Sequence, residues 1–533
     1  MNPQSEADAR TAADASQARR TSGPYAWYAL GVLVVVYTLN FIDRQILSIL
    51  AEDIKDALVL EDGDLGFLYG TAFAVFYAVF GVPLGRLADN WRRGHLMAMG
   101  LALWSGMTAL SGFATNYAQL AAARIGVGIG EASASPAAFS MLAGYFPKNR
   151  RALAASIYTS GVYLGMGLSL PIGGLISDNW NTAFAGGGAP LGLQGWQVTF
   201  LAVGLPGLLV ALWVMTLREP VRRTDAGVIE PVVRPGAWRM FLADVMTILP
   251  PFTLWSVSRF PGALRRNLIG LAVIVAIAFG LIRLTGDAGQ WIAYAVGFYA
   301  LFSWTQSLRF TDPPTHKLIL GSPVVPLAVL GFGCLAVITY VISFWGAPFA
   351  MRTYDVSAST AGVAIGLPGA AAAAAGVILG GRLSDLWKER DPRGRIFTCM
   401  LAAVLPAPFI VAMVLAPDFG TYVLLSPCVY FLANLWTGSA VATYQDFVLP
   451  RMYGTISAVY LVGSTMVGLS LGPYASGKIA AVSGSLQAGV ISMLAASVVA
   501  LVALWALSLR AEAAETTKLE RAIAAGEPPP VAA

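Results

Sequence analysis

Long apolar stretches separated by short charged loops recur along almost the whole 533-residue chain. A membrane-spanning helix needs about 20 apolar residues, and these stretches have about that length. They lie at about 25–50, 66–88, 95–114, 118–143, 152–177 and 197–217, then 267–285 and 289–308, then 323–350, 359–386, 396–416, 421–448, 454–480 and 486–509. The sequence therefore predicts an all-helical membrane protein with fourteen transmembrane helices, arranged as six, two and six.

The composition agrees with a chain that lies mostly in a bilayer. Hydrophobic residues make up 57% and charged residues only 12%, whereas a soluble domain carries about 25% charged residues. The net charge of +5 fits basic loops on the cytoplasmic side, and we expect no nucleic-acid partner. Two histidines and three cysteines show no ligand spacing, so we expect no metal and no bound cofactor.

The positions of the basic residues predict the orientation in the membrane. Lys and Arg mark cytoplasmic segments, and they cluster at the same ends of alternate spans: Arg19, Arg20, Arg92, Arg93, Lys148, Arg150, Arg151, Arg218, Arg222, Arg223, Lys388, Arg390, Arg393 and Arg395. The segment 51–64 is acidic and is expected outside. We expect an integral protein, with a bacterial inner membrane as its location and both termini in the cytoplasm.

These spans divide the chain into five regions. We expect a disordered cytoplasmic segment at 1–23, a six-helix bundle at 24–217, a linker at 218–322, a second six-helix bundle at 323–509 and a cytoplasmic tail at 510–533. The linker would hold the inserted hairpin, about 267–308. Its segment from Trp238 to Trp255 is either a helix on the membrane surface, ended by Pro250-Pro251, or an irregular connection.

An internal repeat relates the two sets of six spans. The segment Gly85-Arg86-Leu87-Ala88-Asp89 recurs as Gly381-Arg382-Leu383-Ser384-Asp385, and Gly167-Leu168-Ser169-Leu170 recurs as Gly468-Leu469-Ser470-Leu471. The first pair ends the second span of each set, and the second pair lies in the fifth span of each set. The repeat predicts two parallel halves related by an axis along the membrane normal, with the hairpin between them.

The repeated glycine–aspartate turn is a candidate gate. The residues we assign to a cytoplasmic gate are Gly85, Asp89, Arg92, Arg93, Gly381 and Asp385. A carboxylate beside arginines at a helix end can pair across an interface, which would latch the halves in one conformation and release them in another. The alternative is that these charges only set the topology.

Four ionisable residues lie inside the predicted spans. Asp43 and Arg44 lie in the first span, and Arg124 and Glu131 lie two helical turns apart on one face of the fourth. Charges in a bilayer usually face a partner or a pathway. We predict a switch in which protonation of Asp43 or Glu131 releases Arg124; the alternative is a static buried ion pair.

Arg44 projects about 100° away from Asp43 around the helix, so we expect it to face a central cavity and bind an anionic group. Further candidate substrate-binding residues are polar or aromatic side chains within spans: Asn40, Phe73, Tyr77, Trp345 and Asn434. The glycine-rich segments 126–130 and 472–478 lack the strand–turn–helix setting of a nucleotide loop, which argues against an ATP-driven pump.

The motifs resemble those of the major facilitator superfamily and, within it, the spinster-like lipid transporters. The resemblance rests on the repeated turn, on Asn40-Phe41-Ile42-Asp43-Arg44 and on the segment from Arg124 to Ala132, and it covers most of the chain outside the tails and about 225–315. It implies proton-coupled alternating access, with Asp43 and Glu131 as protonation sites and Arg124 as their partner. It also implies an amphiphilic lipid cargo, such as a lysophospholipid or a sphingosine phosphate.

This chain departs from the family pattern in two places. Asn90 stands where the superfamily turn usually has Arg or Lys, and the inserted hairpin adds two spans to the usual twelve. The sequence thus predicts a monomeric, proton-driven transporter of an amphiphilic anion. Alternatives are an exporter or importer of drugs or other small organic solutes, a passive scramblase, and an enzyme of lipid metabolism, for which the isolated His95 and His316 offer no catalytic cluster.

Overall fold

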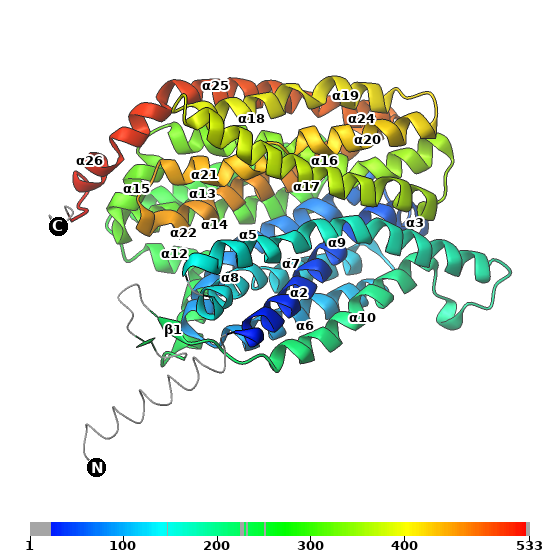
Figure 1. Cartoon of the computed structure of the whole chain (residues 1–533), viewed down its shortest axis with the longest axis horizontal. Helices are drawn as coiled ribbons and strands as arrows, with labels where there is room; N and C mark the ends of the chain where they lie inside the picture. The colour runs from blue at the N-terminus through cyan, green and yellow to red at the C-terminus, as the bar shows by residue number, and fades with distance from the viewer. Residues whose placement is uncertain (1–22, 147, 224–228, 231–232, 250–251, 529–533) are drawn as a thin grey trace, which may run out of the picture.

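The chain folds into two helical bundles that lie side by side, with the helix axes roughly parallel to the long axis of the molecule (Figure 1). The computed structural model describes residues 23–146, 148–223, 229–230, 233–249 and 252–528. The predicted segment 1–22 and Pro250-Pro251 lie outside these residues. The first described helix begins and the last described helix ends at the same end of the molecule, which we call the terminal end; the opposite end is the far end (Figure 1).

The first half comprises the helices before residue 216. They are α2 (Pro24–Ile49), α3 (Ala51–Leu58), α4 (Asp62–Gly66), the π-helix η1 (Phe67–Thr71), α5 (Ala72–Asn90), α6 (Arg93–Ser111), α7 (Tyr117–Glu131), α8 (Ala134–Tyr145), α9 (Lys148–Ala183), the 3-10 turn η2 (Pro190–Gly192) and α10 (Gly195–Met215).

The second half comprises the helices after residue 323. They are α16 (Val324–Tyr354), α17 (Ala358–Lys388), α18 (Gly394–Val404), α19 (Pro406–Val414), α20 (Phe419–Ala433), α21 (Thr437–Asp446), the 3-10 turn η3 (Pro450–Met452), α22 (Tyr453–Val462), the π-helix η4 (Gly463–Leu471), α23 (Gly472–Ser483), α24 (Leu486–Ser492), α25 (Leu494–Thr516) and α26 (Lys518–Ile523).

The linker between the halves is also largely helical. It contains the two-residue strands β1 (Arg222–Arg223) and β2 (Ile229–Glu230), which pair antiparallel, and then α11 (Ala237–Ile248), α12 (Phe252–Val257), α13 (Ala263–Thr285), α14 (Ala288–Thr311) and α15 (Pro313–Leu320). The segment from Trp238 is therefore a helix, as one of the two interpretations predicted. It packs on α5 instead of lying alone on a surface.

The described residues confirm fourteen helical segments of spanning length in the order six, two and six. Eleven of the described segments are long and apolar enough to cross a membrane by length and composition. The others are α6, α14 and the pair α7–α8. These three are rich in Gly, Ser, Trp or Tyr, or are interrupted, and their mean hydropathy is correspondingly low.

Polar caps fix where several spans begin at the far end. The Asn116 side chain accepts from the Gln119 amide at the start of α7, and Ser485 accepts from Ala488 at the start of α24. A cap of this kind satisfies an amide that the helix itself leaves free. At the start of α17, Ser357 accepts from Thr360 in the same way.

Helix breaks and π-helices interrupt spans in both halves. The fourth span breaks between α7 and α8, directly after Glu131, and the corresponding span of the second half breaks between α20 and α21 at Asn434. The second span of the first half contains η1 and the fifth span of the second half contains η4. Interrupted helices are tolerated inside a bundle because neighbouring groups satisfy the freed backbone atoms.

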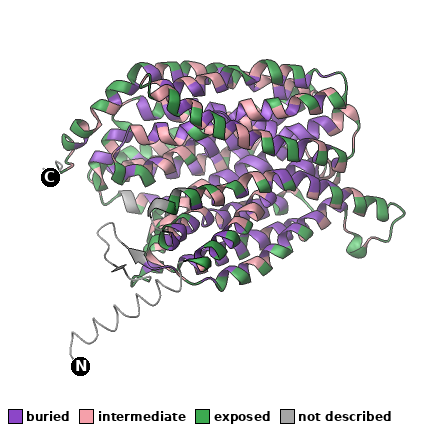
Figure 2. Cartoon of the chain, in the orientation of Figure 1, coloured by how far each residue is buried: buried purple, intermediate pink, exposed green. Residues whose placement is uncertain are grey.

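The halves meet through helices that the repeat pairs with one another. α9 lies along α17 on one side of the interface, while α5, η1 and α4 lie along η4 and α23 on the other. The fifth span of each half therefore packs on the second span of the other half, as a two-fold axis between the halves requires. Buried residues concentrate between the helices and exposed ones line the outer surface (Figure 2).

Small residues bring the halves into close contact at the far end. A Cβ atom at Gly362 of α17 would lie 2.4 Å from the Leu170 carbonyl oxygen of α9, and one at Gly66 of α4 would lie 2.4 Å from the Pro473 carbonyl oxygen. These approaches need glycine because any side chain would collide with backbone.

The predicted tail differs in part from the structure. α25 continues to Thr516 and α26 follows, so helix extends well past residue 510. α26 packs on α15, and the buried Ala522 anchors it there. The sequence from 511 onward is polar, and this contact with the linker was not visible in its pattern.

Replacing Gly362 by valine should destabilise the closed far end. Overpacking a tight contact costs about 1–3 kcal/mol, so we expect the apparent Tm in detergent to fall by several degrees. Gly106 of α6 is the matched control, since nothing lies within 4 Å of its added Cβ. Equal melting temperatures for Gly362→Val and Gly106→Val would contradict the close packing of α9 on α17.

Candidate functional site

A buried ion pair occupies the centre of the first half. The Arg44 guanidinium on α2 donates through Nη2 to Glu131 Oε2 at the end of α7, over 2.7 Å. The Arg44 side chain is 9% exposed and the Glu131 side chain is not exposed. The guanidinium carbon also lies 4.4 Å from the centre of the Phe73 ring and 5.3 Å from that of Tyr77. Aromatic rings in this position stabilise the cation.

Arg124 lies next to this pair and contacts the backbone of Asp43. Its Nη1 donates to the backbone carbonyl of Asp43 over 3.2 Å, and its side chain is fully buried within electrostatic range of Asp43 and Glu131. Glu131 forms its ion pair with Arg44 and not with Arg124. The predicted role of Arg124 as the partner of Asp43 and Glu131 stays a prediction, since Arg124 lies within electrostatic range of both carboxylates while Glu131 forms its ion pair with Arg44.

The orientation of α2 about its own axis explains why Glu131 pairs with Arg44. Successive residues on a helix point about 100° apart, so Arg44 points toward α7 while Asp43 points toward α6. There Asp43 faces the indole of Trp104 and the hydroxyl of Thr108, both fully buried. Asn40 lies one turn before Arg44 and approaches the Glu131 carboxylate. Asp43, Arg44, Arg124 and Glu131 therefore lie together in one buried group, whereas the sequence predicted such a network only for Asp43, Arg124 and Glu131 and placed Arg44 apart from it.

Arg44 is not free to bind an anion in this conformation. The sequence predicted that it faces a central cavity, yet it is buried and paired with Glu131. A ligand anion would have to replace Glu131 as its partner. Two candidate neighbours are well placed for such a ligand, since the rings of Phe73 and Tyr77 lie directly over the guanidinium.

Tyrosines from both halves surround the approach to Arg44. We call this set the tyrosine collar: Tyr37 of α2, Tyr77 of α5, Tyr163 of α9, Tyr340 of α16 and Tyr460 of α22. Tyr37, Tyr77 and Tyr340 lie within electrostatic range of the Arg44 guanidinium, and Tyr460 lies near Tyr37, Tyr163 and Tyr340. All five are partly exposed although they lie inside the bundle. Sequence reasoning found only Tyr77, because single tyrosines within apolar spans give no motif.

Two predicted substrate residues lie elsewhere. Trp345 is fully buried toward the far end, where its indole donates to the Pro473 carbonyl oxygen over 3.1 Å. Asn434 is 9% exposed and donates to the Tyr430 carbonyl oxygen at the break between α20 and α21. Both side chains stabilise helix packing or a helix end, so the prediction that they bind substrate is not supported by their contacts.

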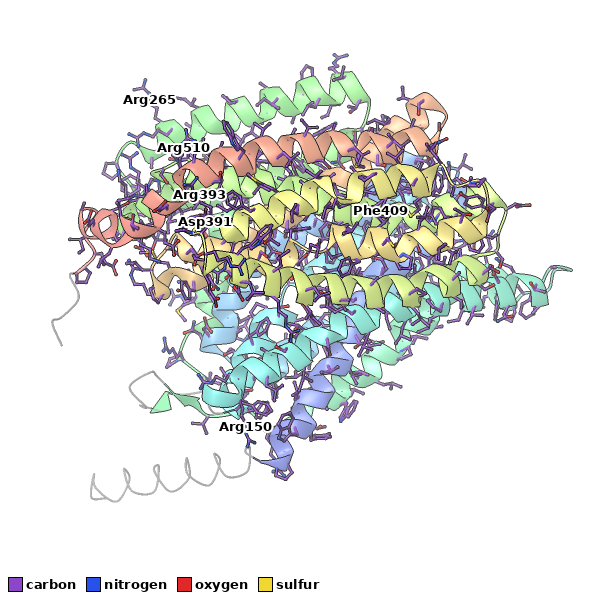
Figure 3. All side chains as sticks on the ribbon, turned by 45° about the horizontal axis from the view of Figure 1, so that its top comes forward. Arg150, Arg265, Asp391, Arg393, Phe409 and Arg510 are labelled. Atoms are coloured by element: carbon purple, nitrogen blue, oxygen red, sulfur yellow. The ribbon has the colours of Figure 1, made fainter. Side chains whose placement is uncertain are left out.

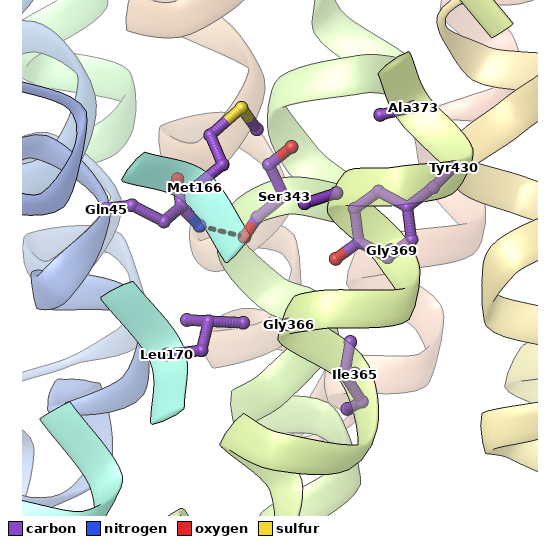
Figure 4. Close-up of a pocket in the computed structure, with 10 residues that line it drawn as sticks. Gln45, Met166, Leu170, Ser343, Ile365, Gly366, Gly369, Ala373 and Tyr430 are labelled. Carbon is purple, nitrogen blue, oxygen red and sulfur yellow. Dashed lines mark hydrogen bonds between the residues drawn. The ribbon is translucent and has the colours of Figure 1, made fainter. Parts of the chain in front are cut away.

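Hydrogen bonds from α2 to the second half lie close to the ion pair. Gln45 Nε2 donates to the Ser343 carbonyl oxygen of α16, and Ser48 Oγ donates to that of Phe344, each over 2.5 Å. Tyr69 donates to Gln45 over 2.9 Å and stacks on Phe344. Figure 4 shows Gln45 joined to Ser343 between α9 and α17. The halves are thus held together next to the site, on its far side.

An ion cluster closes the far end between the halves. Arg352 at the end of α16 pairs with Glu52 of α3 over 2.6 Å and with both oxygens of Asp62, which also accepts from Lys55 over 2.6 Å. We call Glu52, Lys55, Asp62 and Arg352 the far-end latch. Burial raises the pKa of Glu52 above its ordinary value, although Arg352 opposes this rise. Nearby, the Ser359 amide donates to Asp178 across the same interface.

The ion pairs that the structure shows at the repeated turns join each half to itself or to the linker, where Arg86 pairs with Asp244. Arg93 pairs with Glu219 over 2.7 Å and also donates to the carbonyl oxygens of Ser140 and Pro220. In the second half, Asp385 pairs with Arg395, which also pairs with Asp446. The ion pairs found for these turns therefore brace each half and do not latch the halves together.

The other residues of the proposed gate lie at the terminal end. Arg92 and Asp89 are exposed, Gly85 lies near Pro136, and nothing lies within 4 Å of a Cβ at Gly381. Figure 3 shows Arg265, Arg393 and Arg510 toward this end, in keeping with the basic loops predicted there. A gating role for these turns in the opposite conformation stays a prediction.

The chain is similar in sequence to known transport proteins. A sequence profile of the Major Facilitator Superfamily matches residues 33–473. An MFS-type efflux pump of Mycolicibacterium smegmatis is 27% identical over 470 residues, which cover 88% of each chain. Protein spinster of Drosophila melanogaster is 25% identical over 205 residues, covering 38% of this chain and 32% of its own.

Among solved structures, the fold is similar to that of a bacterial homologue of the human lysosomal transporter Spinster. That crystal structure is described as inward-facing and occupied; the TM-score is 0.66 at 24% identity, and the match covers 94% of this chain and 98% of the other. Two six-helix halves around a charged centre define an integral membrane transporter and not an enzyme. The chain belongs to the Major Facilitator Superfamily, and its predicted spinster-like character within that superfamily stays a prediction.

Removing the Arg352 guanidinium from the far-end latch should open that end. In Arg352→Gln the carboxylates of Glu52 and Asp62 lose their shared partner, and their mutual repulsion favours separation of the halves. A reporter cysteine at Gln45, which is 5% exposed, should then react severalfold faster with a water-soluble maleimide.

Two comparisons control this experiment. The reporter Gln45→Cys alone gives the baseline, and Arg393→Gln removes an exposed arginine that lies 3.8 Å from Asp391 at the terminal end. If the reporter reacts equally fast in the Arg352 and Arg393 variants, the far-end latch does not hold the halves together.

Proposed function

We propose that this transporter moves an amphiphilic anion of the lysophospholipid or sphingolipid class by proton-coupled alternating access. The observation that carries the proposal is the Arg44–Glu131 pair, which lies beneath partly exposed tyrosines from both halves. An anionic head group can replace the Glu131 carboxylate at Arg44, since guanidinium groups bind phosphate and carboxylate alike. The apolar walls of the bundle suit an acyl chain.

The proton enters through the carboxylate that the cargo displaces. A carboxylate left without its cation in an apolar site favours the protonated form. Binding of an anion at Arg44 therefore goes with proton uptake at Glu131, and departure of the anion restores the pair and releases the proton. Asp43 is the second protonation site, and Arg124, held on the Asp43 backbone, compensates the charge of whichever carboxylate is ionised.

The conformation described by the contacts is closed at the far end. We infer that the terminal end is cytoplasmic, because the basic loops gather there. We also propose that the protein is a monomer and that it lies in a bacterial inner membrane. The described state is then inward-facing. Opening of the far-end latch, with closure of the repeated turns, would give the outward-facing state.

A second candidate function is the export of drugs or other small organic solutes. It is favoured by the relative in Mycolicibacterium smegmatis, which is described as an efflux pump and matches along 88% of both chains. The two candidates share the proton coupling and differ in cargo. Competition by lysophospholipids, sphingoid phosphates, hydrophilic anions and cationic dyes for the same uptake would separate them.

Proteoliposome uptake tests the coupling. With a fluorescent lysophospholipid and an imposed pH gradient, wild-type protein should accumulate cargo, whereas Asp43→Asn and Glu131→Gln should each reduce gradient-driven uptake at least tenfold. Asp391→Asn, which changes a half-exposed carboxylate at the terminal end, is the matched control.

Two results would overturn the proposal. Uptake of every amphiphile that ignores the pH gradient would remove the coupling and favour a scramblase. Wild-type uptake in both Asp43→Asn and Glu131→Gln would place the proton site elsewhere.

A further inference from the structure

The inserted hairpin lies across one of the two seams between the halves. α14 packs on α5 and η1 of the first half and reaches η4 of the second. Gly297 marks the crossing point, since a Cβ there would lie 2.9 Å from Val75 of α5 and 2.8 Å from Met466 of η4. α13 packs on α14 and α12, on the outer side. The seam between α5 and η4 is thus covered by protein.

The polar contacts of the hairpin go to the second half. Asp287, in the turn between α13 and α14, accepts from Tyr474 over 2.6 Å and pairs with Lys478 over 3.0 Å. Farther along α14, the Tyr294 hydroxyl donates to the Met466 carbonyl oxygen over 2.7 Å. At the terminal end, Asp312 pairs with Arg451 over 2.9 Å. The hairpin is therefore held at both ends and in the middle.

Contacts with the first half are of another kind. Val75 and Val79 of α5 form an apolar cluster with Tyr294, Ala300 and Met466. Among the residues that the structure describes, no hydrogen bond or ion pair joins α13 or α14 to the helices of the first half. Helices that pack without polar contacts can shift past one another by small sliding motions, whereas hydrogen bonds in an apolar setting hold their partners in place.

An earlier helix of the linker, α11, makes its polar contacts with the first half instead. α11 is tied to the first half, because Asp244 pairs with Arg86 of α5 over 2.6 Å and the Arg234 amide donates to the Asn90 carbonyl oxygen. The linker is thus divided between the two halves, and the division falls between α11 and α13.

We propose that the inserted hairpin is a fixed side wall of the second half, which moves with that half, slides over α5 and keeps the α5–η4 seam closed to the bilayer. Among the residues that the structure describes, no helix of the linker covers the opposite seam, between α9 and α17. Small residues of α17 there, Gly366, Gly369 and Ala370, leave a cavity of about 20 Å³ against Met166 and Leu170 of α9 (Figure 4). An amphiphilic cargo, which rests on the function proposed above, then passes between bilayer and centre only at this seam.

Two cysteine pairs that share position 297 of α14 test the side wall directly. In a background without the native cysteines, Gly297→Cys is combined either with Met466→Cys or with Val75→Cys, and each pair is joined by a short thiol-specific cross-linker. The link to Met466 should leave pH-driven uptake within twofold of the uncross-linked protein. The link to Val75 should reduce uptake at least tenfold, with recovery in samples that carry the cysteines but no linker.

A second readout does not depend on cargo or coupling. Hydrogen exchange of the far-end segments 62–71 and 463–477 reports opening of the halves in the absence of substrate. The Val75 link should slow this exchange and the Met466 link should not. This result would support the side wall even if no amphiphile were transported, so failure of the proposed function and failure of the side wall remain distinguishable.

Two outcomes overturn the side wall. If the Met466 link slows far-end exchange and the Val75 link does not, the hairpin belongs to the first half. If both links leave exchange unchanged, the hairpin follows neither half, and the α5–η4 seam is not closed by it.

Discussion

The buried pair between Arg44 and Glu131 is the interaction on which the rest of the site depends. Removing one member of such a pair leaves an uncompensated charge and costs about 3–5 kcal/mol, so each group needs a replacement partner whenever the pair opens. Arg44 has aromatic rings beside it, and in the proposed mechanism the cargo anion would become its partner while Glu131 would take up a proton. This requirement would link cargo and proton without any direct contact between them.

One helix connects this pair to the contact between the halves. α2 carries Arg44, which stays within the first half, directly beside Gln45, which reaches the Ser343 carbonyl oxygen of the second half. Ser48, one turn later, makes a similar bond to Phe344. A small rotation or shift of α2 on exchange of partners at Arg44 would therefore alter the bonds that hold the far side closed. Such short-range coupling suits an interface with two discrete packings.

The sequence predicted the architecture better than the details of pairing. Span lengths and the repeated turn were sufficient for two halves and a hairpin, because both depend on local pattern. The partner of Glu131 depends on how far α2 is rotated against α7, which no spacing reveals, and so Arg124 was chosen over Arg44. The far-end latch was not predicted, for the same reason. Glu52 and Asp62 were interpreted as charges that set the topology, because the sequence does not show that Arg352 of a distant span lies between them.

Proton uptake on cargo binding tests the exchange at Arg44 most directly. Calorimetric titration of the purified transporter with a lysophospholipid anion, repeated in buffers of different ionisation enthalpy, measures the protons bound per cargo. We predict uptake of about one proton near neutral pH in the wild type, and none in Glu131→Gln with binding retained. Binding without any proton uptake in the wild type would contradict the exchange of Glu131 for the cargo anion.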